Sequence, residues 1–149
     1  MKIIILAIGK EKDFGGFELV SEYTGRISHY YPCEWKYIGG IDQQTDNKNL
    51  IAQLEKFGSS TYVVALDEKG KEFDSRGFAQ KIEFCLNVSV RTLIFIIGGS
   101  YGLNDEVRTK AHLTLALSKL TFPHQLVRLV LIEQIYRACS IIRGEKYHH

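Results

Sequence analysis

Hydrophobic positions along the chain alternate between short continuous runs and helical stripes. The first run, Lys2–Ile8, is almost wholly apolar and ends at Gly9, as in a strand buried on both faces of a parallel sheet. From Phe17 to Tyr31, apolar residues recur at three- and four-residue steps, which predicts a helix. Similar patterns predict further strands at 34–38, 61–66, 92–97 and 113–117, and helices at 50–57, 74–86, 104–110 and 124–142.

This alternation of strand and helix predicts an α/β fold with a mostly parallel sheet and helices on both faces. Between these elements, residues 42–49 are interpreted as a polar loop and Lys69-Gly70 as a turn. Residues 1–149 are expected to form a single domain, because no linker or repeat divides a chain of this length. Ligands bind beyond the carboxyl ends of parallel strands, so the loops at 66–71, 98–103 and 117–124 are the expected site.

The last predicted helix, residues 124–142, is apolar nearly all round. Such a helix must be buried on more than one side. One side can pack on the sheet, and a second copy of the chain can cover the other. A central position within one domain would also bury it. We favour the homodimer, because a C-terminal helix in a small α/β fold usually lies outermost.

The net charge of +2 hides an uneven distribution. Residues 1–106 hold 12 Lys and Arg against 15 Asp and Glu, whereas residues 107–149 hold 7 against 2. The basic C-terminal end is suited to contact phosphate groups, although a solvated basic surface has the same composition.

Composition and cysteine spacing also indicate the cellular compartment. Cys33, Cys85 and Cys139 are odd in number and widely spaced, which argues against a disulfide framework or a zinc ribbon and favours buried, reduced thiols. No apolar run approaches the ~20 residues of a membrane-spanning helix, and no signal-peptide pattern is present. We expect a cytoplasmic protein with no membrane contact and no metal site.

Two segments are candidates for ligand binding. Residues 97–102 form a glycine-rich stretch after a strand, but the spacing is not that of a dinucleotide-binding fingerprint, and a tight turn would need the same glycines. In residues 117–124, backbone amides could bind the edge of a base while Leu120 and Phe122 enclose it. An ordinary loop with Pro123 near the first helical turn would look alike. No nucleophile motif is visible.

Several motifs together resemble one known family along the whole chain. The chain is similar to the RlmH family of bacterial ribosomal RNA methyltransferases, which belong to the SPOUT class. The matching motifs are Leu66-Asp67, Gly70-Lys71, Gly98-Gly99, Gly102-Leu103, Leu117-Ser118, Leu120-Thr121, Pro123-His124, Leu126-Val127-Arg128, Glu133-Gln134, Tyr136-Arg137-Ala138, Ser140-Ile141 and Tyr147-His148.

The resemblance implies an α/β fold with a C-terminal trefoil knot, an obligate homodimer and S-adenosylmethionine as methyl donor. It implies methylation of N3 of pseudouridine 1915 of 23S rRNA in the assembled ribosome. The residues implied to bind the donor are Leu66, Gly98, Leu117, Ser118, Lys119, Leu120, Thr121 and Phe122.

The resemblance also assigns a role to the tail. Tyr147 and His148, with Arg137, are implied to complete the RNA site beside the cofactor of the other subunit, and Arg128 and Glu133 are further candidates for holding it. His148 as general base is a hypothesis based on the near-neutral pKa of histidine side chains. The chain departs from the family at Ser100, where Pro or Ala is frequent, and at the final His149, where Lys or Arg is frequent. A nucleotide- or ribosome-binding module without catalysis is the alternative function.

Overall fold

A five-stranded parallel sheet forms the centre of the molecule. The computed structural model describes residues 1–10 and 16–147, together with the backbone of His148. The strand order is β2-β1-β4-β3-β5, and all four neighbouring pairs are parallel. This confirms the predicted α/β class. The strands are β1 (Lys2–Ile8), β2 (Cys33–Ile38), β3 (Thr61–Glu72), β4 (Thr92–Ile97) and β5 (Leu113–Ala116).

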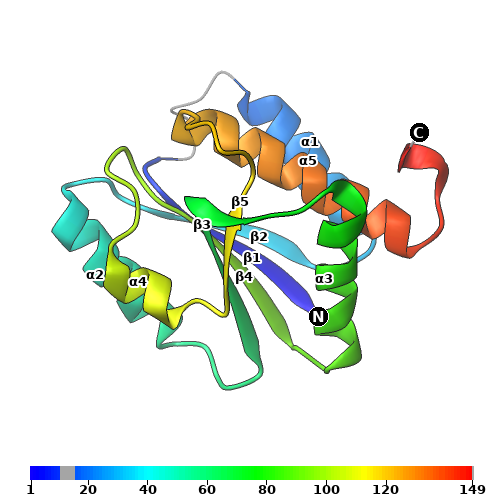
Figure 1. The fold of residues 1–149 in the computed structure, drawn as a ribbon, viewed down its shortest axis with the longest axis horizontal. Helices are drawn as coiled ribbons and strands as arrows, with labels where there is room; N and C mark the ends of the chain where they lie inside the picture. The colour runs from blue at the N-terminus through cyan, green and yellow to red at the C-terminus, as the bar shows by residue number, and fades with distance from the viewer. Residues whose placement is uncertain (11–15, 149) are drawn as a thin grey trace.

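Helices cover both faces of the sheet, as predicted. Figure 1 shows α1, α3 and α5 on one face and α2 and α4 on the other. A short 3-10 helix, η1 (Lys146–His148), follows the last helix. The helices are α1 (Phe17–Ser28), α2 (Gln43–Leu54), α3 (Ser75–Asn87), α4 (Asp105–Lys110) and α5 (His124–Ile142).

The apolar run of β1 is continuous because its side chains enter two cores. Ile3 and Ile5 pack under α1, α3 and α5, whereas Ile4 and Leu6 pack under α2 and α4. All four are at most 1% exposed. Burying such a side chain contributes about 1.5–3 kcal/mol, which favours an interior position for this strand in the sheet.

Helix α2 corrects the prediction of a polar loop at residues 42–49, because the helix begins at Gln43. Asp42 caps it by accepting a hydrogen bond from the Thr45 amide at 2.8 Å. Its buried side includes Asp46 and Asn47 as well as two leucines, so no apolar stripe marked the helix in the sequence.

Strand β3 corrects the prediction of a turn at Lys69-Gly70, because the strand continues to Glu72. Leu66 and Lys71 both pair with Leu115, so residues 67–70 form a bulge. The bulge passes very close to β5, where a Cβ on Gly70 would lie 2.7 Å from backbone atoms of Thr114 and Leu115. The glycine therefore permits a close approach of two strands.

Helix α5 matches its predicted bounds and packs against both α1 and α3. Leu131, Ile132 and Ile135 are fully buried, whereas Leu126 is 41% exposed. Much of its apolar surface is thus covered within one chain, as the central-helix alternative requires.

The three cysteines are free thiols, and burial raises the pKa of each: to about 12 for Cys33 and Cys139 and about 11 for Cys85. Among the helices that the structure describes, none has the length and apolar character needed to cross a membrane.

Candidate functional site

A cavity of about 760 Å³ lies at the carboxyl ends of β3, β4 and β5. Its size falls within the usual range for small-molecule sites. The three loops expected from the strand-end rule enclose it together. Its lining comprises Gln43, Leu66, Asp67, Glu68, Lys69, Ile97, Gly98, Gly99, Ser100, Tyr101, Gly102, Leu103, Arg108, Leu115, Leu117, Ser118, Leu120, Thr121, Phe122, Pro123, His124 and Val127.

The β3 bulge, residues 67–70, forms the first wall. The Asp67 side chain turns back on the bulge, and its Oδ1 accepts a hydrogen bond from the Lys69 amide at 2.9 Å. Asp67, Glu68 and Lys69 all line the cavity, so this wall carries two carboxylates and one ammonium group.

The glycine loop, residues 98–103, forms the second wall. The Gly102 amide donates to the Gly99 carbonyl at 3.0 Å, which closes a tight turn. Gly102 has φ +69°, and a Cβ on Gly98 would lie only 3.0 Å from the Gly102 backbone. The turn therefore requires glycine at both positions.

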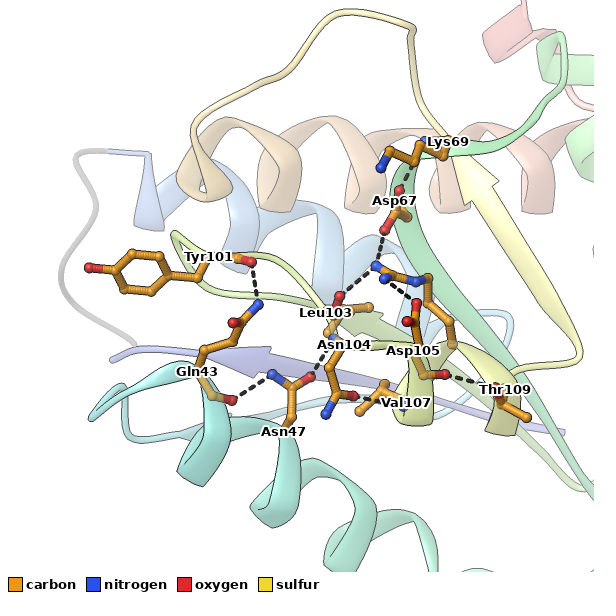
Figure 2. Close-up of polar contacts among 11 residues, drawn as sticks. Gln43, Asn47, Asp67, Lys69, Tyr101, Leu103, Asn104, Asp105, Val107 and Thr109 are labelled. Carbon is orange, nitrogen blue, oxygen red and sulfur yellow. Dashed lines mark hydrogen bonds and ion pairs between the residues drawn. The ribbon is translucent and has the colours of Figure 1, made fainter.

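Helices α2 and α4 hold the glycine loop from outside (Figure 2). Gln43 Nε2 donates to the Tyr101 carbonyl at 2.7 Å. Asn47, which is 1% exposed, accepts from the Asn104 amide at 3.0 Å, and Asn104 in turn caps α4 by accepting from the Val107 amide. The sequence analysis missed Gln43 and Asn47, because both lie in the segment interpreted as a loop.

Arg108 links this second wall to the first. Its Nη1 donates to Asp67 Oδ2 at 2.8 Å and to the Leu103 carbonyl at 2.5 Å. Its Nη2 donates to Asp105 Oδ1 at 2.6 Å. The bond with Asp105 is the main cause that raises the pKa of Arg108, and it lowers the pKa of Asp105. Sequence reasoning did not single out this arginine.

The segment between β5 and α5 forms the third wall. Ser118 Oγ accepts from the Leu120 amide at 3.0 Å, which shapes the turn. Leu120 is 70% exposed at the rim, and Lys119 is exposed outside the lining. The other residues expected to bind the donor line the cavity: Leu66, Gly98, Leu117, Ser118, Leu120, Thr121 and Phe122.

Arg128 lies behind the third wall, on the first half of α5. It is 1% exposed, and its Nη2 donates to the Ile8 carbonyl at 2.7 Å and its Nη1 to the Lys10 carbonyl at 3.0 Å. Its guanidinium also lies 5.2 Å from the Tyr37 ring centre. Arg128 thus fixes the end of β1 from inside the protein and does not line the cavity.

The tail residues form a separate cluster beside the middle and second half of α5. Glu133 Oε1 accepts from Arg137 Nε and Nη2 at 3.0 and 2.7 Å and from the Tyr147 hydroxyl at 3.2 Å. Tyr147 also shares a 3.1 Å hydrogen bond with Tyr23. Burial and these two bonds raise the pKa of Tyr147, so its hydroxyl stays protonated at neutral pH.

This cluster and the cavity lie apart within one chain. Glu133 lies midway along α5 (His124–Ile142), six residues, or about 9 Å of helix, beyond Val127, which lines the cavity. Neither Arg137 nor Tyr147 lines the cavity. The side chain of His148 and all of His149 lie outside the described residues.

No group of three or more His, Cys, Asp or Glu side chains suited to a metal ion occurs within residues 1–10 and 16–147. The polar groups of the cavity are instead carboxylates, cationic side chains and backbone amides.

Known proteins match the chain over nearly its full length. A family model described as a predicted SPOUT methyltransferase matches residues 1–148. Proteins named ribosomal RNA large subunit methyltransferase H from Cytophaga hutchinsonii and Trichlorobacter lovleyi are each 42% identical, with 100% of both chains covered. A solved structure of a probable methylase family protein from Haemophilus influenzae aligns with a TM-score of 0.58 and 12% identity, covering 97% of this chain and 69% of its own.

The fold and the cavity define an α/β protein with a small-ligand site at the carboxyl edge of a parallel sheet. The structural match supports this fold, and the sequence matches identify the family. The chain belongs to the SPOUT methyltransferase family, which confirms the resemblance found in the sequence.

Proposed function

We propose that the protein transfers a methyl group from S-adenosylmethionine to N3 of pseudouridine 1915 of the 23S rRNA in the assembled ribosome. The observation that carries this proposal is the full-length match, at 42% identity, to proteins named as large-subunit ribosomal RNA methyltransferases. The cavity at the strand ends supports it, because it gives the methyl donor a site of suitable size and chemistry.

The cavity suits S-adenosylmethionine on three counts. The apolar side chains of Leu117 and Phe122 suit an adenine ring, and the turn at Ser118–Leu120 suits the hydrogen-bonding edge of the base. Charged groups of both signs line the cavity, Asp67 and Glu68 against Lys69 and Arg108, which suits a ligand that carries sulfonium, ammonium and carboxylate groups. When bound, the donor supplies an activated methyl group on its sulfonium.

The protein's own contribution is alignment and charge, because an activated methyl donor needs little covalent assistance. The cavity walls would orient the donor and exclude water. Arg137, held by Glu133, would stabilise the negative charge that forms when the base loses its N3 proton. Tyr147 would stay protonated, as the raised pKa of its hydroxyl implies, and its hydrogen bond to Glu133 would help to hold the Glu133–Arg137 pair. The proton acceptor in this proposal is His148.

The complete site in this proposal forms between two chains of a homodimer. It is supported by the lining of the cavity, which contains neither Arg137 nor Tyr147 of the same chain, because a partner's tail can reach a cavity that a chain's own tail does not line. A single domain over residues 1–149, a knotted C-terminal segment and a cytoplasmic location, where ribosomes are found, belong to the same proposal.

Transfer of labelled methyl groups tests this function. Purified protein, labelled S-adenosylmethionine and ribosomes from a strain lacking the modification should give labelled 23S rRNA, and unmodified free rRNA serves as a comparison. If the protein binds ribosomes without transferring label, it is the non-catalytic ribosome-binding alternative. If calorimetry shows binding of a flavin and not of S-adenosylmethionine, it is a nucleotide-binding module.

A further inference from the structure

Arg108 joins two walls of the cavity that have no sheet pairing between them. Its Nη1 donates both to Asp67 on the β3 bulge and to the Leu103 carbonyl at the end of the glycine loop. The bulge has left the register of β3 with β5, and the loop lies beyond the end of β4. Hydrogen bonds to side chains therefore hold positions that the sheet does not hold.

Both carboxylate oxygens of Asp67 accept hydrogen bonds that support this link. One oxygen accepts the Lys69 amide and orders the bulge, and the other accepts Arg108. The side chain of Asp67 is 12% exposed and that of Arg108 33%, so solvent screens this pair less than a fully exposed ion pair. A shift of the guanidinium would move the bulge and the glycine loop together.

The helix that carries Arg108 is fixed by other contacts. Asn104 caps α4, Asn47 holds the backbone of Asn104, and Val107 is fully buried. Removing the guanidinium therefore leaves α4 attached to the protein while it releases the two walls.

We propose that Arg108 is a positioning residue that sets the spacing of the β3 bulge and the glycine loop, and through them the affinity of the cavity for its ligand. The identity of that ligand, S-adenosylmethionine, rests on the proposed function. The effect of Arg108 on the two walls is a property of the free protein and is measurable without any ligand.

Amide hydrogen exchange of the free protein tests the effect on the walls. Arg108→Met keeps an apolar stem and removes the donors, and Lys110→Met is the matched control, because Lys110 lies on the same helix and pairs with Glu55 outside the cavity lining. We expect exchange in residues 67–70 and 98–103 to become about tenfold faster in Arg108→Met and to stay unchanged in Lys110→Met. Unchanged exchange in these segments, or an equal increase along the whole chain, overturns the proposal.

Calorimetric titration with S-adenosylmethionine tests the consequence for binding. Arg108→Met is expected to bind about ten- to a hundredfold more weakly than wild type, and Lys110→Met is expected to bind equally well. Asp67→Asn should also weaken binding. The variant that carries both substitutions should bind S-adenosylmethionine no more weakly than the weaker-binding single variant, because the two side chains act as one unit. Unchanged affinity in Arg108→Met, or additive losses in the double variant, overturns the proposal. If the wild type does not bind the donor, the proposed function fails, and the exchange measurement alone decides the role of Arg108.

Discussion

Individual side chains set the protonation states on which the proposed chemistry depends. Tyr147 is kept neutral by burial and by its bonds to Tyr23 and Glu133, while the pKa of Arg137 is raised chiefly by its hydrogen bond with Glu133. The tail cluster therefore presents a cation at neutral pH, and both Arg137 and Tyr147 donate to the Glu133 carboxylate. His148, with the near-neutral pKa usual for histidine side chains, is the proposed acceptor of the N3 proton.

His148→Ala is expected to lower methyl transfer to ribosomes by about 10²–10⁴-fold, the usual contribution of a general base. Donor affinity should remain that of the wild type. Turnover is measured with donor and ribosomes both saturating, so that a loss of binding does not imitate a loss of chemistry. His29→Ala, an exposed histidine beyond α1, is the matched control. Full turnover by His148→Ala would show that another group accepts the proton.

The buried thiols predict a loss of stability in alkali. Burial disfavours the thiolate and raises the pKa of Cys33 and Cys139 from 9.0 to about 12 in the folded protein. A group with a raised folded-state pKa stabilises fully below its unfolded pKa, and this contribution declines as the pH rises from 9 toward 12. The free energy of unfolding in urea should therefore fall across this range.

Cys33→Ala provides the check on this effect. Its free energy of unfolding should decline less steeply with pH than that of the wild type, because one of the shifted thiols is gone. An identical slope in both proteins would mean that Cys33 does not titrate as burial requires.

At the scale of elements, two glycines differ in whether the structure leaves room for a side chain. Gly70→Ala should lower the free energy of unfolding by about 1–3 kcal/mol, because its Cβ would contact the backbone of Thr114 and Leu115 at 2.7 Å. Gly25→Ala should raise it by about 0.4–1 kcal/mol, since nothing lies within 4 Å of a Cβ at that position inside α1. Urea denaturation of both variants measures the two changes. Equal effects would contradict the close approach of the bulge to β5.

How far the sequence predicts each element depends on how its buried side is built. Strands β1 and β4 and helix α5 were predicted with their exact bounds, because nearly uninterrupted apolar residues mark them. The first half of helix α2 was missed, and the helix predicted at 50–57 begins at Gln43, because Asp46 and Asn47 occupy its buried side. The β3 bulge was interpreted as a turn, because nothing local to Lys69-Gly70 reveals pairing with a strand more than forty residues away.

The same limit applies to the site. The strand-end rule located the loops around the cavity, since it depends only on the order of strands and helices. It did not find Gln43, Asn47 or Arg108, whose roles arise from contacts between distant segments. The tail cluster was found only through the resemblance to a family.

At the scale of the whole molecule, the proposed site requires two chains. Mixed dimers of two inactive variants test this directly. His148→Ala retains an intact cavity, and Gly98→Val disturbs the glycine loop that lines the cavity, because even a Cβ there lies 3.0 Å from the Gly102 backbone. If each site combines one chain's cavity with its partner's tail, co-refolded mixtures should regain partial methyl transfer.

Separately purified variants, mixed without refolding, are the control for slow exchange of subunits. Mixtures that stay inactive although mass spectrometry detects the mixed dimer would place cavity and tail of one site in the same chain. A monomer in sedimentation experiments at assay concentration would contradict the two-chain site altogether.

The position of the transferred methyl group is the most direct test of the proposed function. Ribosomes lacking the modification are incubated with the protein and S-adenosylmethionine, and nuclease fragments of the 23S rRNA are sequenced by mass spectrometry. We expect one added methyl group, on N3 of pseudouridine 1915. A methyl group on another nucleotide, or no methyl group on ribosomes that the protein demonstrably binds, would contradict the proposed reaction.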